Sequence, residues 1–259
     1  MKLAVVACVV ATAFAVPSMH DFAEHTEKVV KALEPQLAER MRARLAQQGA
    51  LAAGQPCDEK KFLDAQNKFY AAIGLKPVRS KKQIARKVFA LIVADGIEGF
   101  RTLAKNIMEW EKDMKDNFGC YEPQNLQRLG YSIFEIFSVI LNTLNSVIMA
   151  HTVEDLAEDY SCAVKTSMDT RTEEIYLLNL AFYAALGAKG ANQCRAVSFY
   201  VSAMTGLYKH DCGEGVANFV YGQIIVPISL FFSHCRLPPP PKKIAALLNQ
   251  PDVKAMRFL

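Results

Sequence analysis

A narrow polar seam on one predicted helix carries the residues best placed to do chemistry in this chain. Between Tyr131 and Met149 the polar side chains fall mainly at steps of three, four and three residues, at Glu135, Ser138, Asn142 and Asn145. Residues at these steps share one face of an α-helix. A carboxylate and two amides that converge in apolar surroundings can orient the polar end of a small hydrophobic molecule.

The other faces of this helix, which the sequence predicts over 126–150, are almost entirely apolar. A helix that is apolar on most sides lies inside a bundle rather than on its surface. Phe134 and Phe137 on this helix, with Phe231 on a later apolar helix, are the predicted lining of a ligand-binding interior. Two alternatives stay open: the seam is the only wet edge of the helix, or neighbouring helices satisfy its polar groups.

The patterns of common catalytic and metal sites are absent from the sequence. It contains no G-x-S-x-G, H-E-x-x-H, P-loop, G-x-G-x-x-G or EF-hand pattern. His210 and His234 each lie within two residues of a cysteine, where a cation near a helix end is a simpler interpretation than a metal ligand. We therefore predict no catalytic residue, no metal site and no cofactor. Catalysis by dispersed residues stays open.

The cysteines predict three disulfides. Cys8 lies in a predicted signal peptide, and the remaining six are Cys57, Cys120, Cys162, Cys194, Cys212 and Cys235. An even number indicates full pairing in an oxidising compartment. Cysteines at opposite ends of one helix cannot pair, because about 16 helical residues span roughly 24 Å and bridged Cα atoms lie within about 7 Å. If the later helices run up and down, the pairs are Cys57–Cys120, Cys162–Cys212 and Cys194–Cys235.

The first fifteen residues have the pattern of a cleavable signal peptide. Lys2 precedes an apolar run over 3–10, and Ala13-Phe14-Ala15 is a small-x-small cleavage pattern. The run is shorter than the roughly 20 residues of a membrane span. We therefore expect a secreted, extracellular protein, with an N-terminal membrane anchor as the alternative.

In the rest of the chain the apolar residues recur at helical spacing, and no segment alternates apolar and polar residues as a β-strand does. Asp58 is a predicted N-cap, and Gly74 is a predicted stop. A capping box at 80–83 opens a long helix that reaches about residue 114, with Gly96 and Gly99 marking a bend or a close crossing. The next helix starts at Pro123 and reaches about residue 150.

Further helices are predicted to open at the capping boxes 152–155 and 170–173, and then to run over 194–209 and 215–233 with a kink at Pro227. These elements predict an all-α, largely up-and-down bundle. Its expected organisation is a signal peptide (1–15), a helical arm and linker (16–56), a disulfide-stapled domain (57–237), and a Pro-rich exit with a short amphipathic tail (238–259).

Together these patterns predict a secreted carrier of a hydrophobic small molecule such as a fatty acid or sterol. The rival hypothesis is a non-enzymatic interaction or structural protein with a solid core and a protein partner. The net charge of +4 is too small to indicate nucleic-acid binding. Glu135 and Pro227 in the two most apolar helices disfavour stable membrane spans. A hairpin that inserts only after unfolding is a further alternative.

Overall fold

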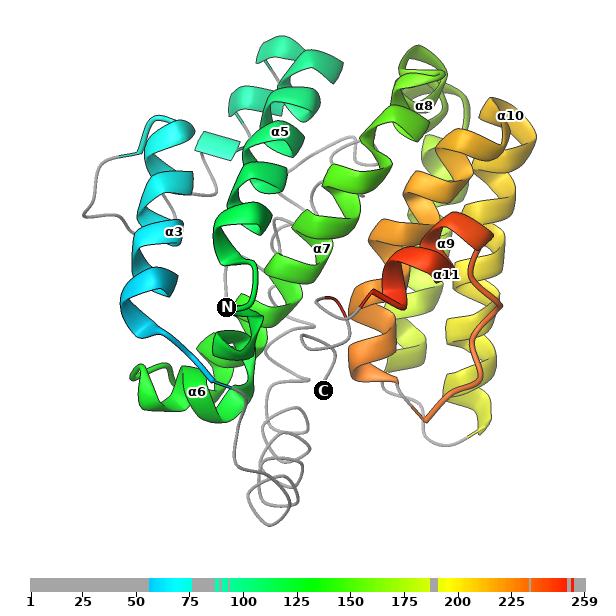
Figure 1. Ribbon diagram of the computed structural model, residues 1–259. Coiled ribbons are helices and arrows are strands. Elements are labelled where there is room, and N and C mark those ends of the chain that lie inside the picture. Colours follow the sequence, from blue (N-terminus) through cyan, green and yellow to red (C-terminus); the bar gives the residue numbers. More distant parts are fainter. Residues whose placement is uncertain are drawn as a thin grey trace. The chain divides into compact units, whose positions relative to one another are not determined.

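The predicted all-α class is confirmed. The computed structural model describes residues 56–75, 87–88, 90–92, 94–186, 191–232, 234–250 and 253, without the side chains of residues 133, 134, 137, 183–186, 191, 227, 230 and 231. The regular elements in this part of the chain are all helices, and none is a strand (Figure 1). The predicted signal peptide (1–15) and almost all of the predicted arm (16–55) lie outside the described residues.

The chain divides by its internal contacts into two compact units. In the described part, the first unit comprises residues 56–151 and 246–253, and the second comprises residues 152–245. The helix α7 (Ile133–Ala157) and the short helix α11 (Lys242–Leu248) each pass from one unit into the other. Each disulfide joins two residues of the same unit.

The first unit is built on α3 (Glu59–Ala72) and α5 (Ile97–Met114), which lie side by side (Figure 1). As predicted, the Asp58 carboxylate caps α3 by accepting a hydrogen bond from the Lys61 backbone N–H at 3.0 Å. Gly74 follows the helix with φ of +76°, a value that glycine adopts without strain. The ring of Tyr121 packs edge-on against Phe62 and Trp110, so the aromatic residues form the centre of this unit.

The predicted bend at the paired glycines is confirmed. Helical residues up to Asp95 are followed by Gly96 with φ of +54°, and α5 begins at the next residue. A Cβ atom on Gly99 would lie 2.0 Å from the backbone oxygen of Leu91. The chain can therefore fold back on itself here only because position 99 has no side chain.

Two predicted helix boundaries were wrong. The helix expected over 123–150 is broken at Gly130, where φ is +85°, so α6 (Pro123–Arg128) and α7 are separate elements. The helix expected to open at Thr152 does not exist, because α7 continues to Ala157 with Thr152 fully buried. A capping box is a local signal, and here tertiary packing covers the residues that compose it.

The second unit contains α8 (Tyr160–Lys165), η2 (Thr166–Thr170), α9 (Thr172–Leu186) and α10 (Ala191–Phe231). Asp159 caps α8 by accepting a hydrogen bond from the Cys162 N–H. The backbone of α10 leaves helical geometry at Gly213, with φ of +86°. This break separates the two helices that the sequence predicts on either side of it. The predicted amphipathic tail is α11, which buries Ile244, Leu247 and Leu248.

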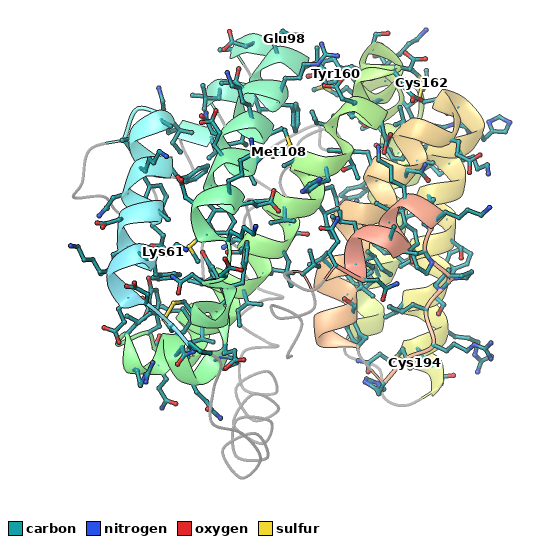
Figure 2. The ribbon with its side chains drawn as sticks, viewed as in Figure 1. Lys61, Glu98, Met108, Tyr160, Cys162 and Cys194 are labelled. Carbon is teal, nitrogen blue, oxygen red and sulfur yellow. A yellow bond between two sulfur atoms is a disulfide. The ribbon has the colours of Figure 1, made fainter. Side chains whose placement is uncertain are left out.

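All three predicted disulfides are confirmed. The Cα–Cα distances are 4.7 Å for Cys57–Cys120, 5.6 Å for Cys162–Cys212 and 5.1 Å for Cys194–Cys235. Figure 2 labels Cys162 and Cys194 near opposite ends of the second unit, as the up-and-down helices require. Among the described helices, none combines the length and the hydropathy needed to cross a membrane.

An ion pair between Arg171, which directly follows η2, and Asp211 on α10 predicts acid sensitivity. The Arg171 guanidinium donates two hydrogen bonds to the Asp211 carboxylate, at 2.9 and 3.2 Å, and His210 Nδ1 lies 2.7 Å from the same group. The hydrogen bonds from Arg171, and then the contact with His210, lower the pKa of Asp211 from 3.8 to about 2. A lowered pKa in the folded state adds stability above pH 3.8, and this stability is lost as the pH falls toward 2.

We therefore expect the difference in Tm between the wild type and Asp211→Asn to shrink as the pH falls from about 5 to about 2. Thermal unfolding followed by circular dichroism across this range measures the difference. A difference in Tm that stays constant would show that Asp211 contributes no charge-dependent stability.

Candidate functional site

The four polar residues of the predicted seam divide into two pairs on α7. Glu135 and Asn142 lie on a partly exposed edge, whereas Ser138 and Asn145 are buried, with 4% and 3% of their surface exposed. The first alternative, a wet edge, therefore fits Glu135 and Asn142, whereas the second does not fit Asn145, because no neighbouring helix of the described part satisfies its polar atoms. Phe134 and Phe137 lie in α7 and Phe231 lies in α10, but the structure does not describe their side chains.

Glu135 caps the helix that carries it. Its carboxylate accepts hydrogen bonds from the backbone N–H and the hydroxyl of Ser132, at 3.0 and 2.8 Å. In return the N–H of Glu135 donates to the Ser132 hydroxyl at 3.4 Å. This reciprocal pair is a capping box, and it fixes the start of α7. The pattern Ser132-x-x-Glu135 was visible in the sequence, although the prediction gave Glu135 a ligand-binding role only.

Asn145 is the unusual member of the seam. Neither its amide nitrogen nor its amide oxygen has a hydrogen-bond partner. Its neighbours along α7, Leu141, Leu144 and Ile148, are 1% exposed or less. An unsatisfied buried polar group costs about 1–3 kcal/mol. The only link between other seam residues is a long hydrogen bond from the Asn142 amide to the Ser138 hydroxyl, at 3.4 Å.

A neutral network that the prediction missed lies beside the seam. Hydrogen bonding to the side chains of Gln66 on α3 and Thr143 on α7 lowers the pKa of the buried Tyr121 hydroxyl, and Gln66 has the same effect on Tyr131. Burial raises the pKa of Tyr121 above the usual range of tyrosine, more than these hydrogen bonds lower it. This network is therefore uncharged at physiological pH. Its members are distant in sequence, so no local pattern signals it.

The second unit has a buried amide of its own. Gln223, the polar exception in the apolar second half of α10, is 3% exposed and has no partner for its side-chain nitrogen. Two other buried polar side chains of this unit have partners: the Tyr200 hydroxyl donates to the Asn179 oxygen at 2.8 Å, and the Asn179 nitrogen donates to the Ile175 carbonyl. Sequence alone does not distinguish Gln223 from Asn179.

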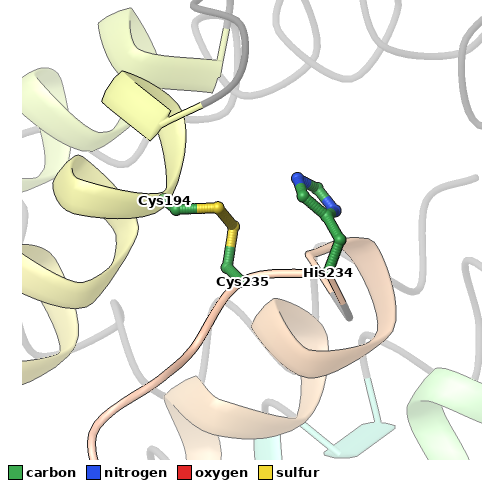
Figure 3. A group of neighbouring side chains, drawn as sticks. All are labelled: Cys194, His234 and Cys235. Carbon is green, nitrogen blue, oxygen red and sulfur yellow. A yellow bond between two sulfur atoms is a disulfide. The ribbon is translucent and has the colours of Figure 1, made fainter.

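One cluster in the described part has the residue types of a metal site. The ligand atoms of Cys194, His234 and Cys235 lie within 4.8 Å of one another (Figure 3). The two sulfur atoms are bonded to each other, as Figure 3 shows, and a metal requires thiolates. In the disulfide form this cluster therefore offers a metal only the imidazole of His234.

An open groove of about 440 Å³ lies along α3 and α5 of the first unit. Its lining is mostly charged: Asp58, Lys60, Lys61, Asp64, Ala65, Lys68 and Asp113. Several of these charges already have partners, since Lys68 pairs with Asp113 at 2.8 Å and Lys61 donates to the Lys115 carbonyl. The groove includes no residue of the seam, and its mixed charges do not suit an apolar ligand.

No family model, no curated protein and no solved structure matches this chain.

Proposed function

We propose that this protein is a secreted, non-catalytic carrier of a hydrophobic small molecule, which it binds along α7 with the Asn145 amide holding the polar end. The observation that carries the proposal is the buried Asn145 side chain without a partner for either polar atom. A ligand that supplies the missing hydrogen bond recovers a free energy that the empty protein has lost. The three disulfides support secretion, because such bonds persist in oxidising compartments.

The surroundings of Asn145 support an apolar ligand. The α7 side chains of the first unit are buried over most of the helix circumference, and the fully buried ones are all aliphatic: Ile136, Ile140, Leu141, Leu144, Val147 and Ile148. A single amide among aliphatic side chains is the usual composition of a site that orients an apolar molecule by one polar contact.

The test is native mass spectrometry of the protein from a eukaryotic secretion host, followed by organic extraction and lipid analysis. We expect a stoichiometric apolar compound on the wild type and at least a tenfold weaker retention by Asn145→Leu. Leu is close to Asn in shape and removes the unsatisfied amide, so the empty variant should be at least as stable as the empty wild type. The loss of ligand would then not reflect unfolding.

Asn142→Leu is the matched control, since Asn142 lies on the same helix but on its partly exposed edge. This variant should retain the compound. Equal retention by Asn145→Leu and the wild type would contradict the proposal. So would a wild type that stays unliganded after incubation with mixed lipids.

The exposed apolar residues of the second unit favour an interaction protein as the second candidate. Phe199 on α10 is 62% exposed, and Tyr176 and Leu177 on α9 are 45% and 55% exposed. Exposed aromatic residues are enriched where proteins bind one another. If the wild type binds no lipid, substitution of these residues and capture of a defined protein partner become the next experiment.

A further inference from the structure

We infer that the polar end of the ligand is an uncharged hydroxyl group, as in a long-chain alcohol or a sterol, and not an ionised carboxylate. This inference rests on the proposed function. It starts from the chemistry of the unpartnered group: the amide of Asn145 has both a free donor and a free acceptor. A hydroxyl can accept from the first or donate to the second, whereas a carboxylate can only accept and would be repelled by the amide oxygen.

The interior of the first unit provides no charge to pair with an ionised ligand. Its buried polar side chains in the described part are all uncharged: Asn117, Asn125, Ser138 and Asn145. Asn117 and Asn125 donate to the backbone carbonyls of Asp58 and Gly119. The polar groups left for a ligand are therefore Asn145 and its neighbour Ser138, whose hydroxyl carries only the long bond from Asn142.

The one carboxylate of the seam is already engaged. Glu135 is held by Ser132 at the start of α7 and lies on the partly exposed edge of the helix. Asn145 is ten residues further along the same helix, roughly 15 Å away at 1.5 Å per residue. Glu135 is therefore too far from Asn145 to select a ligand whose polar end is positively charged.

The second unit shows what a buried charge requires in this protein. Asp155 is the only charged residue among the buried polar side chains of the described part. Its carboxylate accepts a hydrogen bond from the Lys243 ammonium at 2.6 Å. A buried ion without such a counter-ion is unfavourable by several kcal/mol. An ionised fatty acid at Asn145 would lack this compensation, whereas an alcohol would not need it.

The test uses three probes with one chain length: hexadecanol, hexadecanoate and hexadecane. Each is titrated into the delipidated, full-length secreted protein at neutral pH, and the bound fraction is read by native mass spectrometry. For the wild type we expect hexadecanol to bind at least tenfold more tightly than either hexadecanoate or hexadecane. For Asn145→Leu we expect hexadecanol to lose at least tenfold in affinity, while hexadecane binds as well as before or better. Ser146→Ala, a change at a partly exposed position of α7 outside the seam, should retain the wild-type order.

The outcomes separate this inference from the proposed function. Tighter binding of hexadecanoate than of hexadecanol would overturn the hydroxyl assignment and leave the carrier function standing. A preference for hexadecanol that survives in Asn145→Leu would overturn the assignment of the polar contact to Asn145. Binding of none of the three probes to the wild type, with no native lipid recovered either, would overturn the carrier function and this inference together.

Discussion

Replacing both Cys57 and Cys120 by Ala should lower the free energy of unfolding by about 4 kcal/mol, according to the loop-closure entropy of a bridge between residues 63 apart. The effect acts mainly on the unfolded chain, because other contacts hold the same ends together in the folded one. The Asp58 N–H donates to the Asn117 side chain at 2.8 Å, and the Asn117 amide donates back to the Asp58 carbonyl at 3.0 Å. The folded structure around the bridge should therefore survive its removal.

Urea denaturation followed by circular dichroism measures this loss, after mass spectrometry has shown that the other two bridges are intact. The matched control is Cys162→Ala with Cys212→Ala, whose bridge spans 50 residues. Since the entropy depends on the logarithm of loop length, this control should lose a similar free energy. A loss below about 1 kcal/mol for Cys57→Ala/Cys120→Ala would show that the unfolded chain is already restrained there.

The substitution Gly99→Ala should destabilise the protein by about 1–3 kcal/mol, although alanine is the better helix former. The added Cβ would lie 2.0 Å from the Leu91 oxygen and 2.7 Å from the Leu91 carbonyl carbon. Both atoms belong to the backbone, so the clash cannot be relieved by a change of rotamer. Relief requires separating α5 from the preceding helical residues, which would disturb the buried Phe100 and Leu103.

Gly206→Ala is the control for this substitution. A Cβ at Gly206 meets nothing within 4 Å, and the residue lies on an exposed position of α10. The same change should therefore stabilise the protein by up to about 1 kcal/mol. Urea midpoints of the two variants should move in opposite directions. A shift of the same sign and size in both would contradict the close approach at Gly99.

Local signals at the helix ends were readable from the sequence because they depend on neighbouring residues only. The Asp58 cap, the Gly74 stop and the break at Gly213 follow from side-chain chemistry and glycine backbone freedom over a few positions. The same kind of signal gave a wrong helix start at Thr152. This residue is buried within the length of α7, and its burial outweighs a capping preference of about 1 kcal/mol. The capping role of Glu135 was not predicted, although its pattern is local. The apolar periodicity predicted one continuous helix through Gly130, so no helix start was expected at Ser132.

The cysteine pairing was predictable for a different reason. A helix has a fixed rise per residue, so the helix lengths placed each cysteine at one end of the bundle or the other. Cys162 and Cys212 then share one end, and Cys194 and Cys235 share the other. Cys57 and Cys120 remain as the third pair. A rigid element converts sequence distance into spatial distance, which a loop does not do.

By itself, the sequence determined that this protein is all-helical and which face of α7 carries polar residues, and it predicted the cysteine pairs on the condition that the later helices run up and down. Only the tertiary structure decided which of these residues is buried without a partner. Helical periodicity places Glu135 and Asn145 on one face, and the local contact with Ser132 puts Glu135 in a cap, but packing from elements distant in the chain leaves Asn145 buried without a partner. Burial and hydrogen-bond satisfaction depend on which chain segments meet in space, and periodicity within one helix contains no information about that.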